Sequence, residues 1–567
     1  MRTELLKAAT ADGNKLLLAS MSELWPSNMR HVAAEHGNFE TNAMGLMRAA
    51  ERGDLQTVYY LHETGNVPCG VFDGEALICA AENGHLLTLR YLHEFGHVPC
   101  GVQDGQALFR AAEEGHLDTV RYLHETGGVP CGVQDGKALI RAAQEGYLQT
   151  LHYLHETGGV PCGVQDGKAL IRAAGRGDLQ TLRYLHEIGH VPCGVQDGKA
   201  LMRPAGWGDL QTLRYLHETG HVPCEVQDGL ALIRAAKMGE MRTLRYLHET
   251  GGVPCGVKHG AALTCAAENG DLQTLRYLHE TGHVPCGVQD GLALIGAAEL
   301  GDIKTVTYLH EIGGVPCSVQ NGRALVHAAG RGNLETVKYL HEIGGVPCSV
   351  QDGLALVLAA EGCHHEIVRY LQETGGGPCG VQNGLALVRA AGMGNLKTVK
   401  YLHEIGGVPC SVQDGLAFVR AAEGCNLESV RYLHEAGGVP CGVQDGLALV
   451  LAAERGHHEI VRYLHETGGV SCGVQDGKAF ICAAEHGYLQ TLRYLHETGH
   501  VPCDVQDGKA LIRAAKKGEM RTRRYLHEAG HVPCGVQDGE ALTCAAENGD
   551  LQTLRVVVES RKGLSRC

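Results

Sequence analysis

The chain is built on a period of 31 residues. Cysteine recurs at this interval sixteen times from Cys69 to Cys534, and tyrosine recurs at the same interval from Tyr60 to Tyr525. A fixed period of about 20–50 residues is typical of solenoids, in which each copy buries its apolar surface against the next copy. The repeat therefore overrides the estimate of about four domains that a chain of 567 residues would otherwise suggest.

One repeat, residues 167–197, shows the expected local structure. It reads GKALIRAAGRGDLQTLRYLHEIGHVPCGVQD. The segment ALIRAA has helical spacing, and Gly177 permits a tight turn after it. Asp178 is placed to cap a second helix, LQTLRYLHE, which we expect to end at Gly189. The remaining residues, HVPCGVQDG, are predicted to form an extended projecting arm that closes on the turn dipeptide Asp197-Gly198.

The copies should stack, because a unit of this size cannot bury both faces of two short helices alone. We predict an all-α solenoid of helix-turn-helix units with projecting loops. Residues 1–42 read as a degenerate N-terminal capping segment, residues 43–538 as sixteen repeats, and residues 539–567 as a truncated C-terminal capping repeat. Arg523 stands where the matching repeat has Leu244, so we expect fraying over residues 508–567.

The unit resembles the ankyrin repeat over residues 43–567. The residues that carry the resemblance are Ala173-Ala174, Gly177, Leu182, Leu185 and Gly189. The period is shorter than the family's, the Thr-Pro-Leu-His start of the first helix is reduced to Ala-Leu-Ile, and histidine replaces the second leucine of the Leu-Leu pair. The resemblance implies an ankyrin-like solenoid that binds other proteins along its concave face and carries no catalytic site.

The cysteine series invites a metal or redox interpretation, which the spacing opposes. Equivalent residues in stacked repeats lie about 10 Å apart, whereas a disulfide needs Cα atoms within about 7 Å. We therefore predict small, half-buried loop residues, with no metal and no cofactor. Reduced thiols, the absence of a secretory signal and the absence of a long apolar run predict a cytoplasmic or nuclear protein. A thiol-rich metal or redox buffer stays an alternative function.

A histidine series runs from His62 to His527, interrupted by Gln372. We expect a neutral imidazole in the seam between repeats, hydrogen-bonded to a loop carbonyl. The alternative is a response to pH, since many histidines would gain charge together. No catalytic constellation is confined to a single repeat, and no Gly-Lys-Ser/Thr phosphate loop occurs, so we expect no enzyme activity.

Partner binding should use positions where the repeats differ. The pair that follows Ala-Ala varies most, and the first helix carries arginine in five consecutive repeats from Arg110 to Arg234. In the first two of these repeats nearby glutamates offset the charge, whereas the next three form a basic and aromatic patch. The residues proposed for partner binding are Arg172, Arg176, Arg203, Trp207, Arg234, Lys237 and Met238.

This patch predicts a protein partner with an acidic segment, and Trp207 as its anchor. The net charge of −15 gives no general basic footprint for nucleic acid and no polybasic membrane signal, so neither is an expected partner. We expect a monomer. The leading hypothesis is a non-catalytic interaction scaffold; the alternative to it is an array expanded by duplication that has no specific partner.

Overall fold

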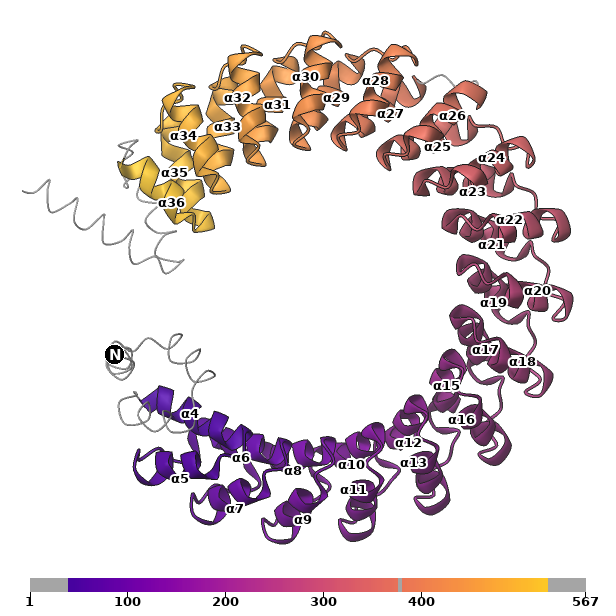
Figure 1. Ribbon diagram of the computed structural model, residues 1–567, viewed down its shortest axis with the longest axis vertical. Helices are drawn as coiled ribbons and strands as arrows, with labels where there is room; N and C mark the ends of the chain where they lie inside the picture. The colour runs from indigo at the N-terminus through magenta and orange to yellow at the C-terminus, as the bar shows by residue number, and fades with distance from the viewer. Residues whose placement is uncertain (1–38, 376–379, 529–567) are drawn as a thin grey trace, which may run out of the picture. The chain divides into compact units, whose positions relative to one another are not determined.

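The computed structural model describes residues 39–375 and 380–528, and in these ranges the regular elements are helices only. The chain divides into two compact bodies. The N-terminal body comprises residues up to Ala266 together with Gln273–Val284, and the C-terminal body comprises Ala267–Leu272 and the residues from Pro285 onward. Each repeat contributes two antiparallel helices (Figure 1), which confirms the predicted all-α architecture.

In the N-terminal body, neighbouring first helices pack into one layer and second helices into another. Within this body the first helices line the inner side of the curve in Figure 1. The first helices are α4 (Phe39–Glu51), α6 (Val71–Glu82), α8 (Val102–Glu113), α10 (Val133–Glu145), α12 (Val164–Arg176), α14 (Val195–Gly198) with η3 (Lys199–Leu201) and α15 (Met202–Trp207), α17 (Val226–Met238) and α19 (Val257–Glu268). The second helices are α5 (Leu55–Glu63), α7 (Leu86–Glu94), α9 (Leu117–Glu125), α11 (Leu148–His152) with η1 (Tyr153–Thr157), α13 (Leu179–Arg183) with η2 (Tyr184–Ile188), α16 (Leu210–Arg214) with η4 (Tyr215–Thr219), α18 (Met241–Glu249) and α20 (Leu272–Glu280).

The C-terminal body repeats the same two-layer arrangement. Its first helices are α21 (Val288–Leu300), α23 (Val319–Arg331), α25 (Val350–Glu361), α27 (Val381–Gly392), α29 (Val412–Glu423), α31 (Val443–Glu454), α33 (Val474–Glu485) and α35 (Val505–Lys517). Its second helices are α22 (Ile303–Thr307) with η5 (Tyr308–Ile312), α24 (Leu334–Glu342), α26 (His365–Gly375), α28 (Leu396–Glu404), α30 (Leu427–Glu435), α32 (His458–Glu466), α34 (Leu489–Glu497) and α36 (Met520–Glu528).

The turn between the two helices forms as the sequence predicts. Gly177 ends α12 in the left-handed region with φ 80°, which only glycine adopts without steric cost. The carboxylate of Asp178 then accepts hydrogen bonds from the backbone N–H groups of Gln180 and Thr181, so it is the N-cap of α13. Leu182, in the following turn, is fully buried.

The second helix ends at Ile188, and Gly189 is its C-cap as predicted. The helix widens in its last turn, where the backbone N–H of Gly189 donates to the carbonyl of Tyr184 at 2.9 Å. Gly189 itself has φ −74°, and the left-handed residue is the next one, His190, with φ 51°. The predicted cap residue is therefore confirmed, and only its conformation differs from the left-handed glycine cap, because the left-handed residue follows it.

The predicted extended arm is wrong. Only a few residues before Cys162 lack helical or turn structure, and the segment after it turns back at once. Gln165, Asp166 and Gly167 all have φ between 49° and 70°. They form a kink at the start of α12, and the regular part of that helix follows them. Three consecutive left-handed residues reverse the chain in a compact turn, so this repeat forms no projecting hairpin of the ankyrin type.

The cysteine series lies deeper than predicted. Cys131 and its described counterparts are 1–5% exposed, so the expectation of half-buried loop residues is wrong. A Cβ built on Gly158, in the next repeat, would lie 2.6 Å from both Cβ and Sγ of Cys131. The same glycine–cysteine contact recurs between successive repeats in both bodies. Each thiol therefore fills a gap against the backbone of its neighbour.

The predicted ends of the solenoid fall largely outside the described residues. The first described helix, α4, begins at Phe39, ahead of the expected start of the repeats at residue 43. The rest of the capping segment, residues 1–38, and the whole of 539–567 lie beyond the described ranges, so the predicted division into cap, repeats and cap stays a prediction. None of the described helices has both the length and the apolar character needed to cross a bilayer.

Arg523 is held inside the helix pair of its repeat. Its side chain is 3% exposed, at the position that Leu492 fills in the preceding repeat. The helices α35 and α36 are formed around it. Residues 529–567 are not described, and the predicted fraying therefore stays a prediction.

We predict that Gly158→Ala destabilises the protein by about 1–3 kcal/mol, because the added methyl group overpacks the contact with Cys131. The control is Gly163→Ala, where a Cβ meets no atom within 4 Å and φ is −80°; its effect should stay within about 0.5 kcal/mol. Urea denaturation of both variants measures the difference. Equal losses of unfolding free energy in the two variants would contradict the claim that the contact between Gly158 and Cys131 leaves no room for a side chain.

We predict that Arg523→Leu raises the free energy of unfolding of the C-terminal repeats by about 1–3 kcal/mol, since it replaces a buried charge by an apolar side chain. Arg524→Leu, at a side chain that is 61% exposed, is the matched control and should change little. Hydrogen exchange of the α36 amides reports the local effect. Amide exchange that slows equally in Arg523→Leu and Arg524→Leu, or slows in neither variant, would show that the buried charge of Arg523 does not destabilise these repeats.

Candidate functional site

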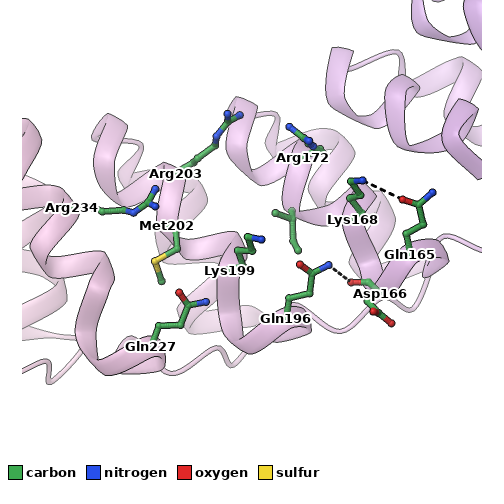
Figure 2. A pocket seen from close by; sticks show the side chains of 11 residues that line it. Gln165, Asp166, Lys168, Arg172, Gln196, Lys199, Met202, Arg203, Gln227 and Arg234 are labelled. Atoms are coloured by element: carbon green, nitrogen blue, oxygen red, sulfur yellow. Dashed lines mark hydrogen bonds between the residues drawn. The ribbon is translucent and has the colours of Figure 1, made fainter.

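A groove runs along the first helices of three consecutive repeats of the N-terminal body. Its volume is about 610 Å³, and its lining comes from α12, α14, η3, α15 and α17. Five of the lining side chains are cationic, and we call this set the basic groove. They are Lys168, Arg172, Lys199, Arg203 and Arg234. Figure 2 shows them in order along the three repeats.

Each arginine of the basic groove reaches it because it occupies one repeated position of the first helix. In the middle repeat that helix is broken by Pro204, which has no backbone N–H to donate. The chain forms the short 3-10 turn η3 first, and α15 then starts at Met202, so Pro204 lies in the first turn, where its missing donor is tolerated. Met202 is 4% exposed and forms part of the groove floor.

The structure brings together three of the predicted partner-binding residues and adds two that we did not predict. Arg172, Arg203 and Arg234 line the groove, whereas Arg176, Trp207, Lys237 and Met238 are not among its lining residues. Lys168 and Lys199 were missed. The signal for them was present in the sequence, since each precedes an arginine of the same helix by four residues, which places both on one face.

Trp207 lies next to the groove and is 60% exposed. The guanidinium carbon of Arg203 lies 5.2 Å from the centroid of the Trp207 ring, a distance at which a cation–π attraction operates. Met238, in the next repeat, is 58% exposed. Two large apolar side chains at the same position of neighbouring repeats therefore flank the cations.

Arg176 contributes less free charge than the sequence predicted. Its guanidinium Nη1 lies 2.6 Å from Glu145 Oε2 of the preceding repeat. Glutamates of the same repeat were expected to offset the arginines, and for Arg141 this is wrong: it pairs with Glu113 of the preceding repeat at 3.3 Å, and not with Glu145 of its own repeat. A glutamate after the Ala-Ala pair can thus reach the next repeat, as Glu113 does while also pairing with Arg110 of its own repeat at 3.1 Å.

The five cations of the basic groove have no such partner. No carboxylate of the described residues lies within 4.0 Å of any of them. Asp166 is the one acidic residue of the lining, and its backbone carbonyl accepts a hydrogen bond from the Gln196 amide. Uncompensated cations in one groove create a positive potential that attracts anionic groups.

A second groove, in the C-terminal body, provides the contrast. It has a volume of about 420 Å³ and is lined by arginines at the same first-helix position. There Arg389 pairs with Glu361 at 3.4 Å, and Arg420 pairs with Glu423 at 2.7 Å. The same helix position therefore gives either a neutralised or a cationic surface, depending on the residue pair that follows Ala-Ala.

Comparison with known families agrees with this architecture. The family model described as "Ankyrin repeats (3 copies)" matches residues 46–135, 294–380, 325–414 and 418–507, which together cover more than half of the chain. The chain belongs to the ankyrin repeat family. A second model, "Ankyrin repeats (many copies)", matches residues 139–186 of this ankyrin solenoid. No curated protein matches the chain.

The histidine series of the ankyrin repeats binds a different partner from the one predicted. Nδ1 of His155 lies 2.9 Å from the hydroxyl of Tyr184 in the next repeat, and that hydroxyl donates to Glu156. Because the single hydroxyl proton goes to the carboxylate, the imidazole N–H is the donor to the tyrosine oxygen. The predicted loop carbonyl is the partner only in a few repeats, as for His341 with the carbonyl of Val346. The pH response of this series stays a prediction.

The described members of the cysteine series are buried thiols. The described residues contain no group of three or more histidine, cysteine or acidic side chains that could hold a metal ion. Burial raises the pKa of the Cys131 thiol from 9.0 to about 11, so the reactive thiolate is disfavoured at neutral pH. Burial, followed by the hydrogen bond to Glu94, raises the pKa of Tyr122 in the same way, to about 12.

These shifts predict that the ankyrin solenoid loses stability at alkaline pH. A group whose folded pKa lies above its unfolded value stabilises the native state below the unfolded pKa, and that contribution disappears as the pH rises through the folded pKa. For the thiols the loss should extend from pH 9 to pH 11, with the tyrosines adding to it above pH 10. Urea midpoints measured across this range test the sign, and a midpoint that stays constant or rises would contradict it.

Proposed function

We propose that this ankyrin solenoid is a non-catalytic scaffold that binds an acidic segment of a partner protein in the basic groove. The observation that carries the proposal is the row of five uncompensated cations on the first helices of three consecutive repeats. Membership of a family whose repeats are generally protein–protein interaction modules supports a protein partner. We further propose that the protein acts as a monomer.

Charge and shape together support an acidic peptide as the ligand. Arginine binds carboxylates through two parallel hydrogen bonds, which makes the interaction directional as well as strong. Trp207 and Met238 offer apolar contact beside the cations, and an exposed tryptophan with arginine is a common combination at the centre of protein interfaces. The predicted role of Trp207 as anchor is kept as part of the proposal, at the flank of the groove.

The other proposed functions find less support. The described cysteines are not joined in disulfides and most are buried, which favours a structural role over metal or redox buffering. Thiols in this state also favour a reducing compartment such as the cytoplasm or nucleus. The lining of the basic groove offers one carboxylate and no histidine, cysteine or serine, so it provides little for acid–base or nucleophilic chemistry. Near-identical copies such as residues 353–371 and 446–464 favour expansion by duplication, but duplication alone gives no reason for a row of uncompensated cations in three consecutive repeats.

The test is binding of a fluorescein-labelled poly-glutamate peptide, followed by anisotropy at low and at physiological salt. We predict that Arg203→Gln with Arg234→Gln weakens binding at least about tenfold, since each lost charged hydrogen bond costs on the order of 1 kcal/mol. Added salt should weaken binding to the unmodified protein more than binding to the variant.

The matched control is Arg389→Gln with Arg420→Gln, which changes the same helix position where glutamates already pair with the arginines. This control should bind the peptide as the unmodified protein does. Equal losses in both double variants would show that binding is non-specific charge attraction. Binding of a single-stranded oligonucleotide in preference to the peptide would replace the proposed class of partner by another.

A further inference from the structure

The two edges of the basic groove carry different chemistry. Figure 2 shows Arg234, Arg203 and Arg172 along one edge and Gln227 and Gln196 along the other. Each repeat therefore supplies one arginine and, across the groove, one side-chain amide, and Lys168 and Lys199 add a second cation in two of the three repeats. A ligand that follows the groove meets the same pair of groups once per repeat.

The amides are held in a defined orientation. Nε2 of Gln196 donates to the carbonyl of Asp166 in the preceding repeat at 3.2 Å, and Nε2 of Gln227 donates to the carbonyl of Asp197 at the same distance. Because the NH₂ group of each amide is held in this way, Oε1 is left as an acceptor. No hydrogen bond to these two oxygens forms among the described residues. The second edge is thus a row of acceptors suited to backbone N–H groups.

The repeat spacing selects the conformation of a peptide that can use both rows. Packed helices lie about 8–10 Å apart, so successive arginines recur at about that interval. A polyproline II helix rises about 3.1 Å per residue with three residues per turn, which places every third side chain on one face about 9.3 Å apart. A β-strand repeats a face every second residue, at about 6.7 Å or 13.4 Å, and does not match the interval.

An α-helix can also match the interval, since seven residues rise about 10.5 Å. However, its backbone N–H groups are bonded within the helix and cannot donate to Oε1 of Gln196 and Gln227. A helix is also about 10–12 Å in diameter with its side chains, which is large for a groove of about 610 Å³ that extends over three repeats. The polyproline II backbone has no internal hydrogen bonds and is slimmer.

We propose that the ligand of the basic groove is an acidic segment in the polyproline II conformation with a carboxylate at every third residue. Its successive carboxylates pair with Arg172, Arg203 and Arg234, and its free N–H groups donate to the glutamine row. This inference rests on the proposed function, and it specifies the spacing and backbone conformation of the partner segment.

The test compares peptides of equal composition and charge. The first is a set of three Glu-Pro-Pro triplets, and its isomer has the three glutamates adjacent and the prolines together. We expect the triplet peptide to bind at least about tenfold more tightly, because only its spacing allows all three carboxylates to reach an arginine at once. A third probe is an α-helical peptide with glutamate at every seventh residue, which should bind more weakly than the triplets.

A double-mutant cycle locates the pairing. The central glutamate of the triplet peptide meets the central arginine, Arg203, whichever way the chain runs. Replacing that glutamate by glutamine should weaken binding to the unmodified protein about tenfold and binding to Arg203→Gln hardly at all. Arg389→Gln serves as the control, and in it the full effect of the peptide substitution should persist.

The outcomes separate this inference from the proposed function. If both isomers bind equally while Arg203→Gln with Arg234→Gln weakens both, the spacing inference is overturned and the acidic-segment proposal stands. Tighter binding of the helical peptide would also overturn the inference alone. If no acidic peptide binds, or all bind the double variant unchanged, the proposed function itself fails.

Discussion

The arrangement of the repeats depends on the contact between a glycine and the cysteine of the preceding copy. The second helix of one repeat ends on Gly158, whose missing side chain lets the backbone rest directly on Cys131. Because no Cβ fits there, the distance and register between the two repeats are set within a narrow range. The hydrogen bonds of His155 with Tyr184, and of Gln165 with the carbonyl of Asp135, form in the same register.

Fixed register turns a single helix position into a row of side chains. Residues one period apart become neighbours, so the surface of each body is determined by which residues occupy a few variable positions. Lys168, Arg172 and their counterparts give a cationic groove because no glutamate stands in the two positions after Ala173-Ala174, Pro204-Ala205 or Ala235-Ala236. Where Glu361 and Glu423 occur, the same row is neutral. Binding specificity in such an array can change by substitution at exposed sites without disturbing the seam.

The sequence predicts the helix pair and its caps well because these features depend on local chemistry. Gly177 and Asp178 lie where steric freedom and a capping carboxylate are needed, and the structure confirms both. Arg172, Arg203 and Arg234 could be placed together because a period converts directly into adjacency. The helical spacing of apolar residues such as Leu182 and Leu185 was enough to predict which face of the second helix is buried.

The errors concern contacts between repeats, which a sequence does not display. The pairing of Arg176 with Glu145 spans a repeat boundary, whereas Arg176 was predicted to be part of a free cationic patch. The hydrogen bond of His155 to the hydroxyl of Tyr184 also spans a boundary, whereas a loop carbonyl was expected. The predicted arm failed because Gln165 and Asp166 adopt left-handed conformations that their residue types seldom take. Such a conformation is stabilised by neighbouring repeats and cannot be read from one copy.

The most direct measurement of the central claim is a crystal structure of the protein with an acidic polyproline II peptide. The account predicts density for the peptide along α12, α15 and α17, with carboxylates on the three arginines of the groove and backbone N–H groups facing Gln196 and Gln227. A peptide bound on the second helices, across the repeats, or in the groove of the C-terminal body would contradict it.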